Sequence, residues 1–599
     1  MPAAWGYISN KPLDCEGQIH ETLKTTFPFK HDFIFSKENF HIGFLLKEKE
    51  SVTVNRQYIF ENEDEIVFCM GHVDNINEIA HIINMPSIKP LHETFIMYQA
   101  YLAKKEKIFS SFLGAWLFVS YQKHSGELIL ARDHTGIYTW YYTVLMNKII
   151  FSTHIAPIFS CNEVSKEMNL LQLAGISVGF PGKADETSFL QIKKVPPAQI
   201  LHILNKHVIS RKYWSTDAIK PRYYKNRQDY FDHFIELYRQ CICEKFIGNN
   251  LASTLSSGLD STFVTAIAAD ELSKRGKTLH AITSIPLYDT QPKKSTRYSD
   301  EAPLASLVAA AYPNIIHHFD NAEQTNPIDG LLKSLTIHHY PLRNATNQYW
   351  LNSLFENLKQ LNIDTLLIGQ MGNITISWPF FDSPVSLKNK TTRLLRSIFP
   401  IDLWKKPSYI KNSFLSEDFI RENHFMKYLW DSQYKPYYYS PSLKRIRHYY
   451  FDFFQLTGYT SWQEKADYYG MNVFDPTADV RIIEYCFSLP DELYKNKNGH
   501  RLLVREVAKN FLPEKVINNN SRGLQASDIQ LRLQNGINNY LPLIKQTLDS
   551  VSNTKIFDMP NLEKNYLLFK NSPYVLLRIF FIFLFINFVT SKKRNRIIG

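Results

Sequence analysis

Short apolar or alternating runs, separated by polar turns, follow one another from Ile8 to about Ser152. One longer stretch, Glu93–Leu102, has the apolar spacing of a helix. Short runs with turn signals between them predict an antiparallel, mostly β domain. The predicted strands are the N-terminal segment MPAAWGYIS and the runs His41–Leu46, Ile66–Gly71, Ala115–Tyr121, Glu127–Arg132, Trp140–Val144 and Ile149–Ser152.

The pattern changes after a polar connection. Lys193–Gln199 and Ser215–Gln228 are rich in Pro or charge and lack periodicity, so we interpret them as a connection and a linker. Apolar residues then keep helical spacing from Phe231 to Phe246, and strand-like and helix-like runs alternate beyond them, which predicts a parallel sheet with helices on both faces. The runs are strands at Leu251–Leu255, Leu279–Ser284, Ile315–Phe319 and Thr365–Ile368, and helices at Ser261–Leu272 and Glu301–Ala311.

The rest of the chain, from about Leu403, has long aromatic-rich helical patterns with a break at Phe474–Pro476. A length of 599 residues is more than one core organises, so roughly two to four domains are expected. The patterns divide the chain into a domain at residues 1–214, a linker at 215–228 and a second domain at 229–599.

Composition and charge exclude several classes of protein. With 44% hydrophobic and 21% charged residues, the chain is globular. The net charge of +11 is spread along the chain, which argues against nucleic-acid binding. The six cysteines form no C-x-x-C pair and match no zinc spacing, and the N-terminus lacks the apolar core of a signal peptide. These features favour a reducing compartment and a cytoplasmic location.

The apolar run Ile579–Ile586 lies close to the C-terminus, between Arg578 and Asn587. About eight to eleven residues are fewer than the roughly 20 that a membrane span needs. We therefore expect no transmembrane span and interpret the run as a terminal helix lying against the second domain. The alternative is peripheral attachment to an anionic membrane, helped by the basic residues Lys592, Lys593, Arg594 and Arg596.

The segment Leu251–Ala269 combines a strand, a short Ser/Gly loop and a helix. Ser256, Ser257 and Gly258 have small side chains, so backbone N–H groups at the helix start can close on phosphate oxygens. Asp260 would hold a Mg²⁺ ion that bridges to pyrophosphate, and Ser261 would cap the helix or donate to the same phosphates. The alternative is an ordinary N-capped turn between strand and helix.

This loop resembles the S-G/S-G-L-D-S loop of the asparagine-synthetase family of ATP-pyrophosphatases. Four other stretches resemble motifs of that family in the same order: Phe112–Tyr142 its amidotransferase-type segment, Tyr298–Ala310 its D-E-x-x-x-A helix, Leu366–Asn373 its metal loop and Phe474–Pro490 its P-x-x-D stretch. The resemblance implies an α/β protein. A class II amidotransferase-like (Ntn-type) α+β domain of four layers, α/β/β/α, would be followed by an adenine-nucleotide α-hydrolase-like parallel α/β domain with helical extensions.

The first departure from the family concerns glutamine. Members that use glutamine cleave it with a cysteine at position 2, where this sequence has Pro2, and their R-L-S-I and N-G-E-x-Y-N stretches are absent. We interpret Cys15 as a buried or incidental thiol and not as a nucleophile. The N-terminal domain is therefore predicted to be degenerate, without glutaminase activity.

The second departure lies in the adenylating domain. The family's G-E-G-x-D-E metal loop is replaced by residues 369–374, in which Gln370 and Asn373 stand where carboxylates are expected. An amide oxygen can coordinate Mg²⁺ but brings no charge, so Asp260 would neutralise more of the ion. The alternative is a loop that has decayed in an inactive relative. Arg501 holds the place of the family's phosphate-contacting lysine and keeps its electrostatic role.

The resemblance implies the following site residues. ATP and Mg²⁺ would bind with the phosphates on residues 256–261, which include Leu259, and with the adenine near Leu255, Thr283, Ile368 and Gly369. Asp260 and Asn373 would hold the metal, Gln370 would orient the substrate carboxylate or amine, and Arg501 would stabilise charge at phosphorus. Asp300 and Glu301 are expected to open a helix, with a direct substrate role as the alternative.

One branch of the family works without glutamine: β-lactam and carbapenam synthetases, and lasso-peptide cyclases, which join a peptide's N-terminal amine to an Asp or Glu side chain. The altered metal loop, the missing cysteine and the segment Arg522–Asp528 (RGLQASD) are most similar to the lasso cyclases. This implies a precursor peptide as substrate, with a leader peptidase and a leader-binding protein as partners. The alternatives are ammonia-dependent asparagine synthesis, synthesis of another amide, and an inactive scaffold.

Overall fold

The computed structural model describes residues 3–9, 13–28, 31–46, 58–85, 92–290, 297–378, 408–434, 443–457, 459–496, 499–551, 554–566 and 573–590. Pro2 and the basic residues after Thr590 lie outside these ranges.

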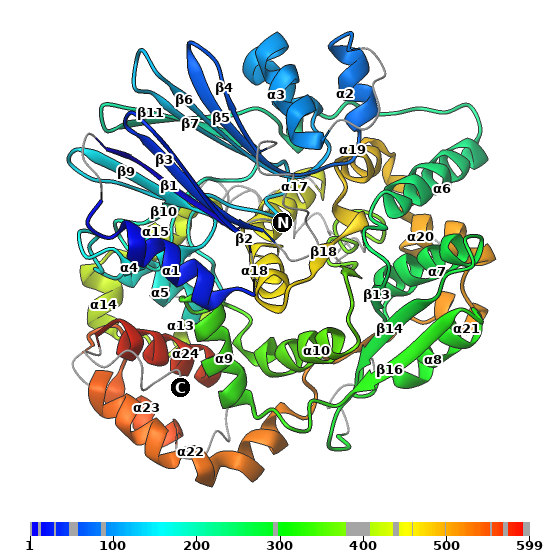
Figure 1. Ribbon diagram of the computed structural model, residues 1–599. Coiled ribbons are helices and arrows are strands. Elements are labelled where there is room, and N and C mark those ends of the chain that lie inside the picture. The colour runs from blue at the N-terminus through cyan, green and yellow to red at the C-terminus, as the bar shows by residue number, and fades with distance from the viewer. Residues whose placement is uncertain are drawn as a thin grey trace.

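Two six-stranded antiparallel sheets form the N-terminal domain (Figure 1). The first has the order β10 (Lys193–Lys194), β8 (Tyr141–Val144), β9 (Lys148–Ser152), β1 (Ala3–Ser9), β3 (Phe40–Leu46) and β2 (His31–Lys37). The second has the order β12 (His207–Lys212), β11 (Gln199–Leu204), β7 (Leu128–Arg132), β6 (Gly114–Gln122), β5 (Glu65–Val73) and β4 (Ile59–Glu61).

The two sheets pack face to face over a buried core that includes Phe44, Phe68 and Trp140. Helices cover both outer faces. A second core, which includes Trp116, binds α2 (Ile76–Ile82) and α3 (Glu93–Lys104), and a third binds α1 (Glu16–Thr26), α4 (Ile155–Ser160) and α5 (Leu170–Ser177). The layers are therefore helix, sheet, sheet and helix, as expected.

Every strand predicted for this domain is present, with ends shifted by one or two residues. The missed strands are β2, β4 and β10–β12, several of which lie at or beside sheet edges. β2 (HDFIFSK) and β11 (QILHIL) contain apolar residues and were missed despite them. Edge strands such as β10 and β12 can present polar or exposed side chains, which discourage pairing with other chains. β12 shows this most clearly, because all six of its residues are exposed.

A five-stranded parallel sheet organises the C-terminal domain, in the order β16 (Ile315–Asp320), β14 (Leu279–Ser284), β13 (Leu251–Thr254), β17 (Thr365–Leu367) and β18 (Asn472–Phe474). Its first four strands were predicted, whereas β18 was read only as a chain break. One face packs on α6 (Arg227–Cys243), α7 (Leu259–Ser273), α8 (Ala302–Ala310) and α19 (Val480–Ser488), and the other on α10 (Gln348–Gln360) and α18 (Tyr459–Tyr469).

Further helices extend this domain, in agreement with the expected helical extensions. Those that bear on the site or the domain contact are α9 (Pro327–His338), η4 (Ala345–Asn347), α17 (Leu443–Thr457), α20 (Leu502–Val507), α22 (Ile529–Val551), α23 (Met559–Tyr566) and α24 (Pro573–Thr590). The shorter ones are η3 (Thr216–Ala218), α13 (Ser408–Lys411), α14 (Glu417–Glu422), α15 (Phe425–Leu429) and α21 (Glu514–Ile517).

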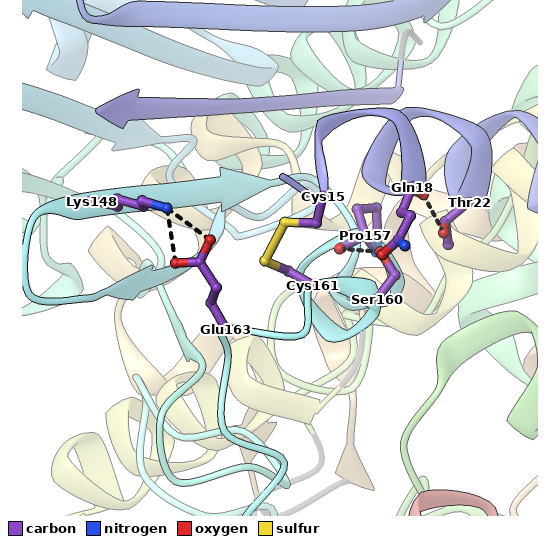
Figure 2. Close-up of a disulfide and its surroundings, with 8 residues drawn as sticks. All are labelled: Cys15, Gln18, Thr22, Lys148, Pro157, Ser160, Cys161 and Glu163. Atoms are coloured by element: carbon purple, nitrogen blue, oxygen red, sulfur yellow. Dashed lines mark hydrogen bonds and ion pairs between the residues drawn. A yellow bond between two sulfur atoms is a disulfide. The ribbon is translucent and has the colours of Figure 1, made fainter. Parts of the chain in front are cut away.

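The expectation that Cys15 carries a free thiol is wrong. Cys15 and Cys161 form a disulfide, with their Cα atoms 5.4 Å apart. Figure 2 shows the bond between the residue that precedes α1 and the residue that follows α4. The two cysteines are 146 residues apart, so spacing alone did not pair them; the strands between them bring α1 and α4 together. The bond also opposes the expectation of a reducing compartment.

The C-terminal apolar helix is longer than predicted, because Arg578 lies inside it. By length and composition α24 could cross a membrane, but 67% of its residues are buried. It packs against α22, α9 and η4 of its own domain and against α5 of the N-terminal domain. Phe588 stacks on Phe159, and Phe585 lies edge-on to Phe189. The interpretation as a helix lying against the second domain is therefore confirmed, and the helix also contacts the first.

Removal of α24 tests this role. A chain that lacks residues 579–599 is expected to aggregate, because the apolar surfaces that the helix covers on both domains become exposed. Solubility and gel filtration measure the outcome. A matched chain that lacks only residues 591–599 keeps α24 and should stay soluble; a soluble, active protein without residues 579–599 would contradict the structural role.

Replacement of Cys15 by Ser tests the disulfide. We expect a loss of about 2–4 kcal/mol in the stability of the N-terminal domain, because the crosslink no longer restricts the unfolded chain. ATP-dependent activity should stay unchanged, since the bond lies outside the C-terminal sheet. Urea unfolding of Cys15→Ser is compared with that of Cys243→Ser, which removes a free, partly exposed thiol. Equal stability of the two variants would show that the bond does not form in solution.

Candidate active site

The candidate site lies where the strand order of the parallel sheet reverses. The chain forms β13, moves outward to β14 and β16, and then returns to the other side of β13 with β17. Ligands bind at such switch points, beyond the carboxyl ends of the strands. The two central strands lead into two loops, residues 255–258 after β13 and residues 368–373 after β17. A cavity of about 380 Å³ lies between them and is called the inner cavity here.

Hydrogen bonds within the first loop fix its shape at the start of α7. Ser256 N donates to Ser261 Oγ at 3.1 Å, and the two hydroxyl groups are 2.6 Å apart. Gly258 N donates to Ser256 Oγ at 3.1 Å. The loop is therefore organised around the N-terminus of a 15-residue helix, whose dipole favours an anion.

Asp260 is buried in the first turn of α7. Burial raises the pKa of its carboxyl group, and the positive charge of Arg501 opposes that shift. Its Oδ1 atom has no hydrogen-bond partner among the described residues. A buried carboxylate oxygen without a partner is costly in free energy, and a bound cation would satisfy it. The residues present thus fit a Mg²⁺ ion at Asp260.

The second loop closes directly on this carboxylate. A Cβ atom on Gly372 would lie 2.3 Å from Asp260 Cγ, so only glycine permits the approach. Asp475, at the end of β18, accepts a hydrogen bond from Met371 N at 2.8 Å and another from the Tyr459 hydroxyl. Burial raises the pKa of Asp475 to about 6. Contacts with Asp260, which follows β13, and with Asp475, which follows β18, therefore fix the position of this loop after β17.

Glu301 is a second carboxylate in the site. It precedes α8, as expected, but its Oε1 atom also accepts hydrogen bonds from Ser257 N at 3.3 Å and from Ser257 Oγ at 2.5 Å. A Cβ atom on Gly523 would lie 2.2 Å from the same oxygen. Burial raises the pKa of Glu301, and the hydrogen bonds from Ser257 oppose the shift. Glu301 therefore opens α8, as expected, and it also binds the phosphate loop, a contact that the sequence did not predict.

Arg501 and Asn373 meet across the site. The Arg501 guanidinium donates to Asn373 Oδ1 at 3.2 Å. Arg501 precedes α20 with a left-handed φ of 58°, a conformation that is rare for residues other than glycine. Gln370 is exposed at the wall of the inner cavity. The amide that replaces a metal-loop carboxylate thus pairs with the arginine that replaces the family's lysine.

A larger, more open cavity of about 600 Å³ lies on the outer side of the phosphate loop and is called the outer cavity here. Arginines dominate its charge: Arg297, Arg501, Arg505 and Arg522 line it. Residues 522–525 of the RGLQASD segment line the outer cavity, and residues 524–528 line the inner one. That segment therefore belongs to the walls of both cavities.

Twelve of the thirteen predicted site residues line one of these cavities. The inner cavity is lined by Leu255, Ser256, Gly258, Asp260, Ser261, Ile368, Gly369, Gln370 and Asn373, and the outer one adds Ser257, Leu259 and Arg501. Thr283 lines neither. Its hydroxyl is buried and donates to Leu255 O at 2.6 Å. Side chains alternate along a strand, so its neighbours Ile282 and Ser284 reach the inner cavity instead.

The apolar end of the inner cavity was not predicted from the sequence. Trp350 and Leu354 of α10 and Trp462 of α18 form this wall. These side chains continue the ordinary apolar faces of their helices, so their spacing predicts core contacts and not a ligand. An aromatic wall beside a phosphate loop provides a surface on which a planar base can pack.

Comparisons with known proteins agree with this geometry. The family model described as asparagine synthase matches residues 248–564, and the glutamine amidotransferase domain matches residues 56–214. The first match covers more than half of the chain. The chain therefore belongs to the asparagine synthase family and is an ATP-dependent carbon–nitrogen ligase.

Two curated relatives are asparagine synthetases (glutamine-hydrolyzing) 3 and 2 of Bacillus subtilis (strain 168). The first is 21% identical over 490 residues, which are 77% of this chain and 75% of the relative. The second is 24% identical over 520 residues, which are 79% of this chain and 65% of the relative. A solved structure, the glutamine phosphoribosylpyrophosphate amidotransferase from B. subtilis complexed with ADP and GMP, is 9% identical with a TM-score of 0.27 and covers 47% of this chain and 74% of its own. A TM-score of 0.27 is too low to support a conclusion about this chain.

Substitution of Asp260 tests the site. Asp260→Asn is expected to reduce pyrophosphate release at least about tenfold, because loss of a directly bound catalytic ion normally costs several kcal/mol. The fold should persist, which circular dichroism checks. The matched control is Asp270→Asn, a surface position on the same helix. A rate above about a tenth of wild type would show that the metal is held elsewhere, with Glu301 as the next candidate.

Proposed function

We propose that this ligase adenylates a carboxylate of a precursor peptide and joins it to the peptide's own N-terminal amine, the reaction of lasso-peptide macrolactam formation. One observation carries the proposal: the N-terminal domain keeps its amidotransferase-like layers but has no accessible thiol. Its cysteines are the disulfide pair and Cys69, which is buried. Burial raises the pKa of the Cys69 thiol well above its usual value. None of them suits nucleophilic attack on glutamine.

Two further observations support an amine that does not come from glutamine. The amidotransferase match begins at residue 56, so it leaves out the segment where the family carries its nucleophile and where this sequence has Pro2. The RGLQASD segment, which resembles the lasso cyclases, lines both cavities. A substrate that reaches these cavities would contact this segment.

The reaction has two steps. An oxygen of the substrate carboxylate attacks the α-phosphorus of ATP, and the bond from that phosphorus to the bridging oxygen breaks, so pyrophosphate leaves. The amine nitrogen then attacks the acyl carbon of the acyl-AMP, the bond to the phosphate oxygen breaks, and AMP leaves while the amine loses its proton. Holding the amine beside the acyl group can supply roughly 7–11 kcal/mol of the barrier.

Several residues of this chain would each have a separate role in the reaction. Ser256, Ser257 and Gly258 bind phosphate oxygens at the helix start, and Arg501 stabilises the charge that builds at phosphorus. Gln370 lies on the wall of the inner cavity, where its amide can orient the carboxylate or the amine. Asp260 would hold Mg²⁺ with Asn373 as a neutral ligand. When bound, Mg²⁺ neutralises phosphate charge and polarises the phosphorus.

The proposal includes the setting of the reaction. A precursor peptide needs a leader peptidase to free its N-terminal amine and a leader-binding protein to deliver it, so these are the expected partners. ATP and ribosomal peptides meet in the cytoplasm. There the Cys15–Cys161 disulfide has to persist against cellular reductants, and its burial protects it, since Cys15 is 4% exposed and Cys161 is fully covered.

Ammonia-dependent asparagine synthesis is the second candidate. It is favoured by one observation, the similarity to asparagine synthetases over more than three quarters of this chain. In that reaction aspartate provides the carboxylate and free ammonia the amine. The loss of carboxylates at Gln370 and Asn373 is what argues against it.

Incubation with ATP, Mg²⁺ and a leader-free peptide that carries an internal Asp or Glu tests the proposal. We expect one AMP and one pyrophosphate per peptide, with loss of one water from the peptide mass. Replacement of the acidic residue by Asn or Gln, or acetylation of the peptide N-terminus, should abolish the mass change. Aspartate with ammonia and aspartate with glutamine are run in parallel. Asparagine formation without peptide cyclisation, or release of glutamate from glutamine, would contradict the proposal.

A further inference from the structure

A third cavity lies where the N-terminal domain meets the C-terminal domain, apart from the inner and outer cavities of the candidate site. Its volume is about 80 Å³. A single water needs roughly 10–15 Å³ by the same kind of measure, so the cavity has room for a small polyatomic ion. Both domains form its walls, with Lys194 and Glu186 on one side and Arg343, Asn344 and Thr460 on the other.

Lys194 brings an unpaired cation to this cavity. The side chain belongs to the two-residue strand β10 and forms no hydrogen bond or ion pair with any residue of the described ranges. Desolvation lowers the pKa of its ammonium group to about 8, the charge of Arg132 acts in the same direction, and the carboxyl groups of Glu464, Asp185 and Glu186 oppose the shift. The Lys194 side chain is partly exposed and lines the cavity, so its ammonium group can receive an anion there.

Arg343 faces the same cavity from the other domain. Its guanidinium lies 4.9 Å from the centre of the Phe453 ring, and it forms no ion pair within the described part of the chain. Burial lowers the pKa of Arg343 to about 10, and the charge of Arg578 adds to the effect. Arg578 lies close by, because its Nε donates to the carbonyl oxygen of Arg343 at 2.9 Å. Two like charges thus lie close together, and neither forms an ion pair with a carboxylate of the described residues.

The other polar groups of the walls are mostly hydrogen-bond donors or already accept hydrogen bonds from neighbouring residues. Asn344 Oδ1 accepts a hydrogen bond from Gln348, so the N–H groups of the Asn344 side chain can donate to other partners. Glu186 is the acidic residue of the lining, and its Oε2 accepts hydrogen bonds from the Tyr428 hydroxyl at 2.5 Å and from Lys183 N at 3.0 Å. The cavity therefore offers positive charge and N–H donors to a guest, and its one carboxylate is largely occupied.

We propose that this interdomain cavity is a binding site for a small anion that bears a carboxylate or phosphate group, held by Lys194 from the N-terminal domain and Arg343 from the C-terminal domain. Bidentate hydrogen bonds from a guanidinium to such a group are among the stronger polar contacts in proteins. Because the two cations come from different domains, the anion links them and stabilises the contact between the domains. The site is separate from the adenylation site, and the inference does not rest on the proposed function.

Binding is measured by calorimetry on the full chain, with a non-hydrolysable ATP analogue and Mg²⁺ present at saturation so that the phosphate loop is filled. The probes are inorganic phosphate and acetate, and a comparison of their Kd values shows whether the site prefers a phosphate or a carboxylate group. We expect Lys194→Met to weaken the Kd at least about tenfold, since charged hydrogen bonds are worth ~1.5–3 kcal/mol. Lys194→Arg should retain binding.

The matched control is Lys193→Met, the neighbouring residue of the same strand, which does not line the cavity and should leave the Kd unchanged. Arg343→Met provides an independent variant if Lys194→Met fails to fold, and the same loss is expected. Binding of an anion should also raise the temperature of unfolding of the wild type but not of Lys194→Met. The proposal is overturned if neither probe binds at millimolar concentration, or if the control variant loses as much affinity as Lys194→Met.

Discussion

Two carboxylates withdrawn from water, Asp260 and Glu301, set the geometry of the site. Each is covered by a glycine that no larger residue could replace, Gly372 over Asp260 and Gly523 over Glu301. The metal loop and the RGLQASD segment therefore close on the phosphate loop from two sides. Burial raises the pKa of both carboxyl groups, and a bound cation would stabilise their charged forms. The side chains that the second loop presents to the inner cavity at Gln370 and Asn373 are neutral amides.

A second buried network holds the two domains together. Lys245 forms ion pairs with Asp74 of the N-terminal domain and with Asp479, and Arg481 pairs with Asp479 and Glu244. The oxygens of Asp74, Glu244 and Asp479 lie within 4.8 Å of one another, as metal ligands would, but the two basic side chains already neutralise them. Buried ion pairs are costly to break because each leaves an uncompensated charge. This network and the contacts of α24 with α5 therefore join the two domains.

The sequence predicted most of the fold and the loops of the site, because both depend on local patterns. Apolar runs located seven strands of the two N-terminal sheets and four of the five parallel strands, and the short S-S-G-L-D-S segment located the phosphate loop. Prediction from the sequence failed where the role of a residue depends on contacts with residues far away in the chain. The bond between Ser257 and Glu301 was not predicted because it spans 44 residues. The resemblance implied that Thr283 lies near the adenine, whereas its hydroxyl donates to Leu255 O and its side chain lines neither cavity. The Cys15–Cys161 pair and the aromatic wall likewise form only after folding. The domain boundaries at 214 and 229 stay a prediction.

The most direct measurement of the central claim follows oxygen from the substrate carboxylate. A peptide whose acidic side chain is labelled with heavy oxygen is incubated with ATP, Mg²⁺ and the enzyme, and AMP, pyrophosphate and peptide are analysed by mass spectrometry. Adenylation transfers one labelled oxygen to AMP and leaves the other in the new amide, so this account predicts label in AMP and none in pyrophosphate. Label in inorganic phosphate, with ADP as the other product, would show attack at the γ-phosphorus and would contradict it.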